Sequence, residues 1–341
     1  MRATNAFLGA ALAALAVGAI AANAQQNANS LLRSGIDAPN SVSYVGQVQN
    51  VEFGQSRADA TIFRIEHKSP DLTRRWYVAP QSLYGDSIIS RGDTSYNVDV
   101  KHGRIIVSKD DAIDDQVAMD DNFSLLTHNY TSVIGPDETV AGRRAISVLL
   151  INKYTGQTVM RVWLDSATHL VLQKERYANN GSITYQMRFD QIRYTSAMPT
   201  AMFNVPGRGF ARVRGADHGA VSSDIANVVR MAGFHARFPQ HVPNGFTPVG
   251  GVVADVKGVR TLHLLYSDGI RTISLFENAR DSAVDMSRFQ VRTADVHGNE
   301  GRYVVDGPTT LLAWSQAGLH LALVGELSRD ELLKIAGSIS P

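Results

Sequence analysis

Strict alternation of apolar and polar residues marks the stretch from 183 to 189 as a strand. Its apolar positions are Ile183, Tyr185, Met187 and Phe189, and every residue between them is polar. A period of two places all four apolar side chains on one face of an extended chain. Just upstream, Asn179-Asn180-Gly181 is typical of a tight hairpin turn, because Asn and Gly accept positive φ. The pattern therefore predicts an antiparallel hairpin.

Similar short runs predict many more strands in the first two thirds of the chain. They lie at residues 42–51, 59–68, 76–78, 87–90, 95–98, 104–108, 145–151, 161–164 and 171–177. Between residues 110 and 130 the apolar spacing changes to three and four, which predicts a helix. Antiparallel strands interrupted by one or two helices indicate an α+β fold. We expect a large curved antiparallel sheet, a half-barrel covered by helices on its concave face.

The remaining third predicts a smaller α+β domain. Its strands are expected at residues 247–253, 261–266, 272–276, 302–305, 310–315 and 319–324. A short helix should be capped by Ser222 or Ser223 and ended by Gly233, because Ser accepts from free amides and Gly permits the left-handed C-cap. Ser328-x-x-Glu331 is a capping box that predicts the start of a last helix, residues 330–336.

Two shifts in composition divide the chain into predicted segments. Residues 6–22 form an apolar run ending at Ala22-Asn23-Ala24, the small-x-small pattern of a signal-peptide cleavage site. Residues 206–221 are rich in Gly and Arg and have no periodicity. We therefore expect a cleaved signal peptide at residues 1–24, a sheet domain at 25–205, a linker at 206–221 and a small domain at 222–341.

Charge and cysteine content narrow the function classes. The chain has 33 basic and 32 acidic residues, and removal of the signal peptide with Arg2 makes the two numbers equal. Nucleic acid and anionic membrane surfaces need a basic excess, so neither is the expected main partner. The absence of cysteine excludes disulfides, thiol chemistry and lipidation after the signal. These features predict a soluble exported protein, periplasmic or secreted.

No polar motif predicts catalysis, a metal or a cofactor. The ten histidines have no H-x-x-x-H or H-E-x-x-H spacing, and the chain lacks a G-x-S-x-G elbow and a phosphate-binding loop. A calcium loop requires a Gly between its carboxylates, and the aspartate pairs at 110–111, 114–115 and 120–121 have none between them. These pairs fit a solvated helix face instead. We expect a non-enzymatic protein, with a hydrolase built on a convergent triad as an alternative.

Aromatic side chains provide the candidate binding surface of the large domain. A curved sheet covered by only one or two helices tends to enclose a cavity, and cavities lined by aromatic groups hold apolar ligands. Ordinary core packing is the alternative for each of these side chains. The residues expected to line such a cavity are Tyr44, Phe63, Trp76, Tyr84, Phe123 and Trp163.

Two groups of motifs resemble those of a known family. One comprises Thr139-Val140-Ala141-Gly142-Arg143-Arg144-Ala145, Arg161-Val162-Trp163-Leu164-Asp165, then Thr168, Leu170, Leu172 and the Gly181 hairpin. The other comprises Val242-Pro243-Asn244-Gly245-Phe246 and the stretch from Leu264 through Ser267-Asp268-Gly269 to Phe276. Together they resemble the periplasmic sigma-E regulators of the RseB/MucB family, whose large domain is similar to lipoprotein carriers of the LolA/LolB type.

The resemblance implies a regulator that binds the periplasmic segment of a membrane anti-sigma factor and shields it from proteolysis. A lipid-like or lipopolysaccharide-like ligand in the large domain would signal envelope stress. It also implies that the small domain holds the partner. The expected partner-binding residues are Leu265, Tyr266, Ser267, Asp268, Gly269 and Phe276.

Other functions remain open from the sequence. A periplasmic lipid or lipoprotein carrier would use the large domain alone, and would leave the small domain without a role. A structural accessory of an envelope machine is a third reading. The sequence names neither the anti-sigma partner nor the lipid, and it does not define the oligomeric state or the contact between the domains.

Overall fold

The computed structural model describes residues 23–54, 57–109, 123–214, 221–256, 258–279, 286–287 and 289–340. Its main element is a sheet of twelve strands in the order β12-β6-β5-β4-β3-β2-β1-β11-β10-β9-β8-β7. The strands at the two ends of this order, β12 and β7, are not hydrogen-bonded to each other, so the sheet is open and not a closed barrel. The strands are β1 (Tyr44–Phe53), β2 (Ala58–Lys68), β3 (Leu72–Ala79), β4 (Ser87–Arg91), β5 (Thr94–Asp99), β6 (Arg104–Lys109), β7 (Tyr130–Val140), β8 (Arg143–Asn152), β9 (Thr158–Asp165), β10 (Val171–Tyr177), β11 (Ile183–Tyr194) and β12 (Ala211–Arg214).

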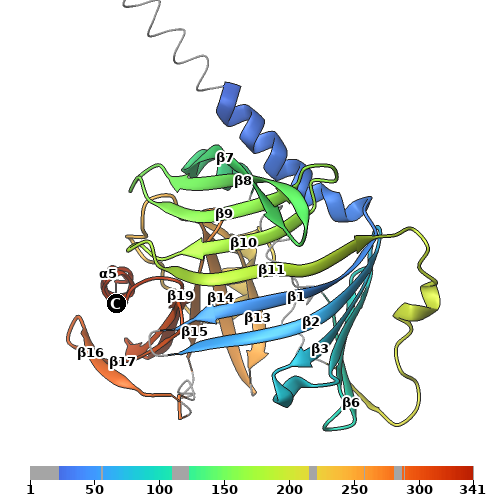
Figure 1. Ribbon diagram of the computed structural model, residues 1–341. Coiled ribbons are helices and arrows are strands. Elements are labelled where there is room, and N and C mark those ends of the chain that lie inside the picture. Colours follow the sequence, from blue (N-terminus) through green and yellow to red (C-terminus); the bar gives the residue numbers. More distant parts are fainter. Residues whose placement is uncertain are drawn as a thin grey trace, which may run out of the picture.

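A helix over residues 23–37 lies along this sheet beside the strands from β8 to β11 (Figure 1). Its Ala28 and Leu32 are buried in one cluster with Val162 and Leu164 of β9. Gly35 permits this close approach, since a Cβ there would lie 2.5 Å from Leu164 Cδ2. The predicted signal peptide lies mostly outside the described residues, but the polar start of the mature chain proves helical. The spacing of four between Ala28, Leu32 and Ile36 is the helical signal that sequence reading missed.

The second sheet has seven strands in the order β13-β14-β15-β19-β18-β17-β16. They are β13 (Thr247–Val256), β14 (Val259–Ser267), β15 (Thr272–Asn278), β16 (Arg292–Val296), β17 (Asn299–Asp306), β18 (Thr309–Gln316) and β19 (Leu319–Gly325). Helices α4 (Ile225–Ala232) and α5 (Arg329–Gly337) pack on one face and share a buried core with Leu264, Leu275 and Leu323. The predicted fold class is confirmed, with strands dominant in both domains.

Local signals at the helix ends account for their boundaries. The predicted capping box of α5 is confirmed: the Ser328 side chain accepts from Glu331 N, and the Glu331 side chain accepts from Ser328 N. Helix α4 is capped by the Asp224 carboxylate, which accepts from Asn227 N, and not by either serine expected from the sequence. Gly233 ends that helix at φ 78°, as its left-handed position requires.

Three parts of the chain differ from the sequence reading. Strands β7 and β16 were not predicted, because charged residues interrupt their apolar patterns. Residues 211–214, inside the expected linker, form β12 and pair in parallel with β6. Helix α3 (Phe123–Asn129) is the described end of the helix predicted from residue 110, and the aspartate pairs lie outside the described residues. Short 3-10 turns occur at η1 (Ala38–Asn40), η2 (Gln81–Leu83) and η3 (Thr200–Phe203).

In the described part of the chain, no helix combines the length and the apolar character needed to cross a membrane.

Candidate functional site

Within the described residues, the two domains contact each other at two places, and the first, which we call the inner contact, is buried. It brings the turn Ser267-Asp268-Gly269 between β14 and β15 against helix α3. The amide nitrogen of Asn129 donates to the carbonyl oxygens of Gly245 and Asp268, both at 2.9 Å. Gly269 has φ 98° and lies so close to α3 that a Cβ would be 2.3 Å from Leu126 N. The backbones of the two domains are therefore in direct contact.

A buried ion pair stabilises the inner contact. The Asp268 carboxylate accepts from Arg271 Nε at 3.0 Å and from the backbone N–H groups of Ile270 and Arg271. Tyr130, the first residue of β7, is fully buried beside this pair. Burial, and next the Asp268 carboxylate, raise the pKa of Tyr130 far above its usual value. The phenol therefore stays protonated at any physiological pH.

The second place, the outer contact, is made by single groups at the ends of strands. Arg176 of β10 forms an ion pair with Glu326, the residue after β19, with side chains 16% and 28% exposed. Gly54, in the turn between β1 and β2, lies beside Gly307, in the turn between β17 and β18. Unlike the inner contact, this one is partly open to solvent.

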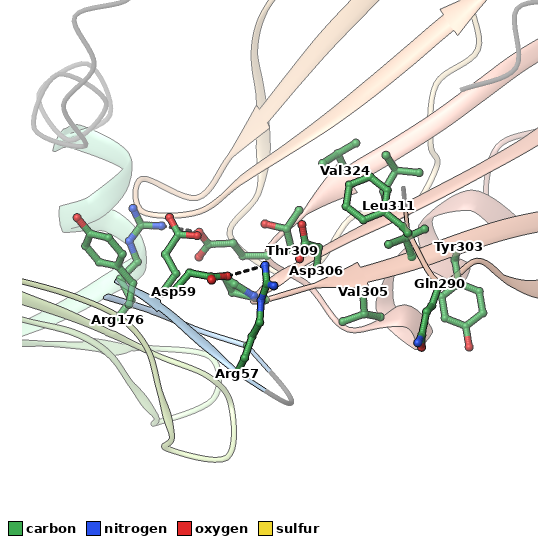
Figure 2. Close-up of a pocket in the computed structure, with 18 of the residues that line it drawn as sticks. Arg57, Asp59, Arg176, Gln290, Tyr303, Val305, Asp306, Thr309, Leu311 and Val324 are labelled. Carbon is green, nitrogen blue, oxygen red and sulfur yellow. Dashed lines mark hydrogen bonds and ion pairs between the residues drawn. The ribbon is translucent and has the colours of Figure 1, made fainter. Parts of the chain in front are cut away.

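A cleft of about 910 Å³ opens beside the outer contact and has walls from both domains (Figure 2). The large-sheet domain contributes charged side chains, including Arg57, Asp59 and Arg176. The second sheet contributes apolar side chains, among them Val304, Leu311 and Val324, together with the charged Arg292, Asp306 and Glu326. The cleft thus has charged groups from both domains and most of its apolar side chains on the wall of the second sheet.

Charged groups in and around the cleft are paired with one another. Arg57 Nη2 lies 3.0 Å from the Asp59 carboxylate, and the Arg176 guanidinium lies 5.2 Å from the ring centroid of Tyr185. At the far side, hydrogen bonds from Arg329 and then from Arg292 lower the pKa of Tyr303 below its usual value. The charged side chains of the cleft can thus form ion pairs with a ligand in place of their present intramolecular pairs.

A second, smaller cavity of about 90 Å³ lies on the concave face of the large sheet. Its lining is apolar except for a few groups, among them Lys174, which is 5% exposed and lies with its Nζ 5.6 Å from the Tyr185 ring centroid. Asn50, Arg75 and Tyr185 line both this concave cavity and the cleft. The two spaces are therefore adjacent and share a wall.

The structure brings together only part of the aromatic set expected in the concave cavity. Tyr44 and Phe63 line it. Phe123 packs instead against the cluster under the residue 23–37 helix. Trp163 is buried on the opposite face of β9, because its neighbours Val162 and Leu164 point into the cavity. The last two expected residues are exposed, Trp76 by 39% and Tyr84 by 61%.

The expected partner-binding residues fall into three different environments. Ser267, Asp268 and Gly269 are buried in the inner contact, so they hold the domains together and are not free for a partner. Tyr266 is part of the small-domain core, where burial raises its pKa to about 12. Leu265 and Phe276 lie half-buried on the other face of the sheet, where Phe276 stacks on His263 with ring centroids 4.2 Å apart. A hairpin that is buried by a distant segment gives no signal of this in its own sequence.

Within the described residues, no group of three His, Asp or Glu side chains could hold a metal ion. The functional residues that sequence reading missed are Arg57, Arg176, Glu326 and the strand β16 beside the cleft. Their alignment depends on how two separate sheets dock, which no local pattern encodes. The arrangement of paired charges facing apolar side chains suits the non-covalent binding of an amphipathic chain segment.

The fold is that of a two-domain protein, an open curved sheet joined to a small helix-covered sheet, with a cleft between them. Residues 86–206 match the family model of the MucB/RseB N-terminal domain, and this match confirms the resemblance seen in the sequence. Residues 239–339 match a model described as a domain of unknown function, DUF4367. A comparison with curated proteins found no significant match.

Solved structures share the whole two-domain arrangement. The complex of Pseudomonas aeruginosa MucA and MucB matches with a TM-score of 0.61 at 17% identity, covering 92% of this chain and 99% of that one. MucB in complex with MucA(peri) gives the same TM-score and identity, covering 92% and 98%. A crystal structure of MucB alone matches with a TM-score of 0.53 at 15% identity, covering 93% and 98%.

Proposed function

We propose that this protein is a non-enzymatic periplasmic regulator that binds the periplasmic segment of a membrane anti-sigma factor. The observation that carries the proposal is that both domains, and not the large sheet alone, match MucB solved in complex with MucA. The MucB/RseB N-terminal domain over residues 86–206 supports it. The apolar run of residues 6–22 supports export to the periplasm.

The interdomain cleft is the proposed place of binding. Its volume of about 910 Å³ accommodates several residues of an extended or helical segment. Bound there, the segment would have one side against Leu311 and Val324 and the other against the charged wall with Arg57 and Arg176. A segment enclosed between two domains is inaccessible to a protease. Shielding from proteolysis is therefore the proposed consequence of binding.

Sensing of a lipid-like signal is assigned to the concave cavity. Its apolar lining suits the end of an acyl chain, and the positive groups Lys174 and Arg75 suit an anionic headgroup. At about 90 Å³ the cavity must widen to hold a whole chain. The cavity shares Asn50, Arg75 and Tyr185 with the cleft. A ligand that displaces these shared side chains would disturb the bound segment and expose it.

A carrier of lipids or lipoproteins is the second candidate, and the concave cavity is the observation in its favour. A carrier, however, has no evident use for the second sheet or for the cleft between the sheets. The inner contact buries Gly269 directly against α3, which is a costly arrangement for a dispensable domain. We therefore place the regulator first.

Affinity capture from the native envelope separates the two candidates. The tagged mature chain is crosslinked in cells, and captured proteins are identified by mass spectrometry. Recovery of a single-span membrane protein with a cytoplasmic sigma-binding region supports the regulator. Its purified periplasmic segment should then bind the chain directly in calorimetry and resist added protease. Recovery of lipoproteins or extractable lipid without that membrane protein overturns the regulator in favour of the carrier.

A further inference from the structure

Within the described residues, strand β16 is an open edge of the second sheet, and Figure 1 shows it as the outermost strand on that side. Open edges attract other extended chains, and natural sheets usually cover them, charge them or break them with proline. In the described residues β16 pairs on one side only, with β17. The strand contains no proline, and its two charged residues, Arg292 and Asp295, lie on either side of Thr293-Ala294.

The other described sheet edges are protected in recognisable ways. Strand β7 contains Pro136 and acidic residues, and its register is broken near that proline. Strand β12 has arginines at alternate positions, Arg212 and Arg214. On β13, Ser222 exchanges two backbone hydrogen bonds with Gly251, at 2.8 and 2.9 Å, and α4 packs against the strand. Strand β16 is short and has charges at Arg292 and Asp295, but within the described residues no proline, bulge or pairing segment protects its outward edge.

The turn that follows β16 determines which of its backbone groups point outward. Val296 and Asn299 are joined by the two-residue turn His297-Gly298, with φ of 48° and 81°. The closing pair of such a hairpin is hydrogen-bonded, so the bonded pairs alternate back along the strand. Arg292, Ala294 and Val296 then bond to β17. The N–H and C=O groups of Thr293 and Asp295, both exposed residues, point away from the sheet.

This open edge is continuous with the interdomain cleft. Arg292, the first residue of β16, lines the cleft together with Phe289 and Gln290. Opposite Thr293 on β17 lies the exposed Arg302, and opposite Asp295 lies Glu300. The edge thus offers a positive group close to the cleft and a pair of negative groups two residues further along.

We propose that an extended segment of the anti-sigma partner pairs with the outward edge of β16 as an eighth strand of the second sheet, and continues from there into the cleft. The added strand would carry an acidic side chain near Arg302 and a basic one near Asp295 and Glu300. Main-chain hydrogen bonds would supply affinity, and these charges would fix the register. The inference rests on the proposed function and adds the mode of recognition.

Replacing Thr293 by proline tests the inference, because proline removes the outward N–H while the bonds to β17 are kept. Thr293→Val is the matched control, since it keeps the N–H and the β-branched shape. The probe is the purified periplasmic segment of the captured anti-sigma factor, titrated into each full-length variant. Loss of one or two hydrogen bonds predicts about tenfold weaker binding by Thr293→Pro and no significant change with Thr293→Val. Equal affinity of the segment for the unmodified protein and both Thr293 variants would refute strand addition at β16, while the proposed regulator function would still stand.

Hydrogen exchange on the unmodified protein provides a second measurement that does not depend on a variant folding. On adding the segment, the amides of Thr293 and Asp295 should become strongly protected, because they acquire partners. The amides of Ala294 and Val296, already bonded to β17, should change little. Unchanged exchange at Thr293 and Asp295 in a saturated complex would refute strand addition. Failure of the segment to bind even the unmodified protein would instead refute the proposed function.

Discussion

The inner and outer contacts join the same two domains with different kinds of interaction. The inner contact places backbone against backbone at Gly269 and satisfies buried carbonyl oxygens through Asn129. The outer contact consists of one partly exposed ion pair, Arg176 with Glu326, and two turns that touch through glycines. Buried hydrogen bonds are costly to leave unmade, whereas exposed ion pairs contribute little. The inner contact should therefore hold the two domains in place, and the outer contact should open when a ligand fills the cleft.

Gly269→Ala should have the largest effect. The new Cβ would collide with Leu126 N, and φ 98° is strained for any other residue. We expect a loss of about 3 kcal/mol in the free energy of unfolding. Gly318→Ala is the control, since Gly318 has φ 78° but nothing within 4 Å of its Cβ position, and it should cost about 1 kcal/mol. Urea denaturation followed by circular dichroism measures both, and equal losses would show that α3 does not constrain Gly269.

Glu277 tests the second domain independently of both contacts. Its carboxyl is fully buried in β15, and burial raises its pKa to about 7, although Arg237 lowers it through a backbone N–H bond and its charge. The folded state therefore holds this proton more tightly than the unfolded chain. Its contribution to stability is complete below about pH 4.5 and is lost as the pH rises through about 7.

We expect the wild type to lose up to about 3 kcal/mol of unfolding free energy between pH 5 and pH 8 from this group. Glu277→Gln keeps the shape and should abolish that part of the pH dependence. Denaturation curves of both proteins at several pH values make the comparison, because other titrating groups cancel in the difference. Parallel pH profiles would show that Glu277 is ionised in the folded protein.

Asn129→Ala should destabilise the chain by about 2 kcal/mol, because the buried carbonyls of Gly245 and Asp268 lose their donor. It should also separate the melting of the two domains in calorimetry. Asn180→Ala, in an exposed turn, is the matched control and should have little effect. A single cooperative transition at unchanged melting temperature for Asn129→Ala would show that the inner contact does not couple the unfolding of the two domains.

Arg176→Ala should have the smallest effect on stability, about 0.5–1 kcal/mol, because its ion pair with Glu326 is partly exposed. Its effect should shrink as salt is added. Arg144→Ala, which removes a more exposed ion pair with Asp137, serves as the control. If Arg176→Ala destabilised the protein as much as Asn129→Ala, the two contacts would not differ as argued.

Local order was readable from the sequence, but domain docking was not. Alternation and turn residues identified the hairpin around Asn180 and most strands, because those signals act between neighbouring residues. The capping box at Ser328 was likewise correct. Charged and short strands such as β16 escaped, because an edge strand needs little apolar surface.

The candidate site was the least predictable part. Val162 and Leu164 of β9 line the cavity, so Trp163 between them points to the other face of the strand. A shift of one residue in the pattern decides which of these side chains faces the cavity. The Ser267-Asp268-Gly269 turn was expected to bind a partner, and its contact with α3 buries it instead. Burial of this turn depends on Leu126, more than one hundred positions away.

The wall shared by the concave cavity and the cleft has a thermodynamic consequence. Asn50, Arg75 and Tyr185 cannot adopt the best arrangement for an occupant of each space independently. Two occupants would therefore alter each other's dissociation constant by the same factor, whichever is added first. The affinity for an unidentified ligand of the concave cavity could thus be measured through the proposed partner segment. A compound that raises the dissociation constant of that segment tenfold must itself have a tenfold higher dissociation constant when the segment is present.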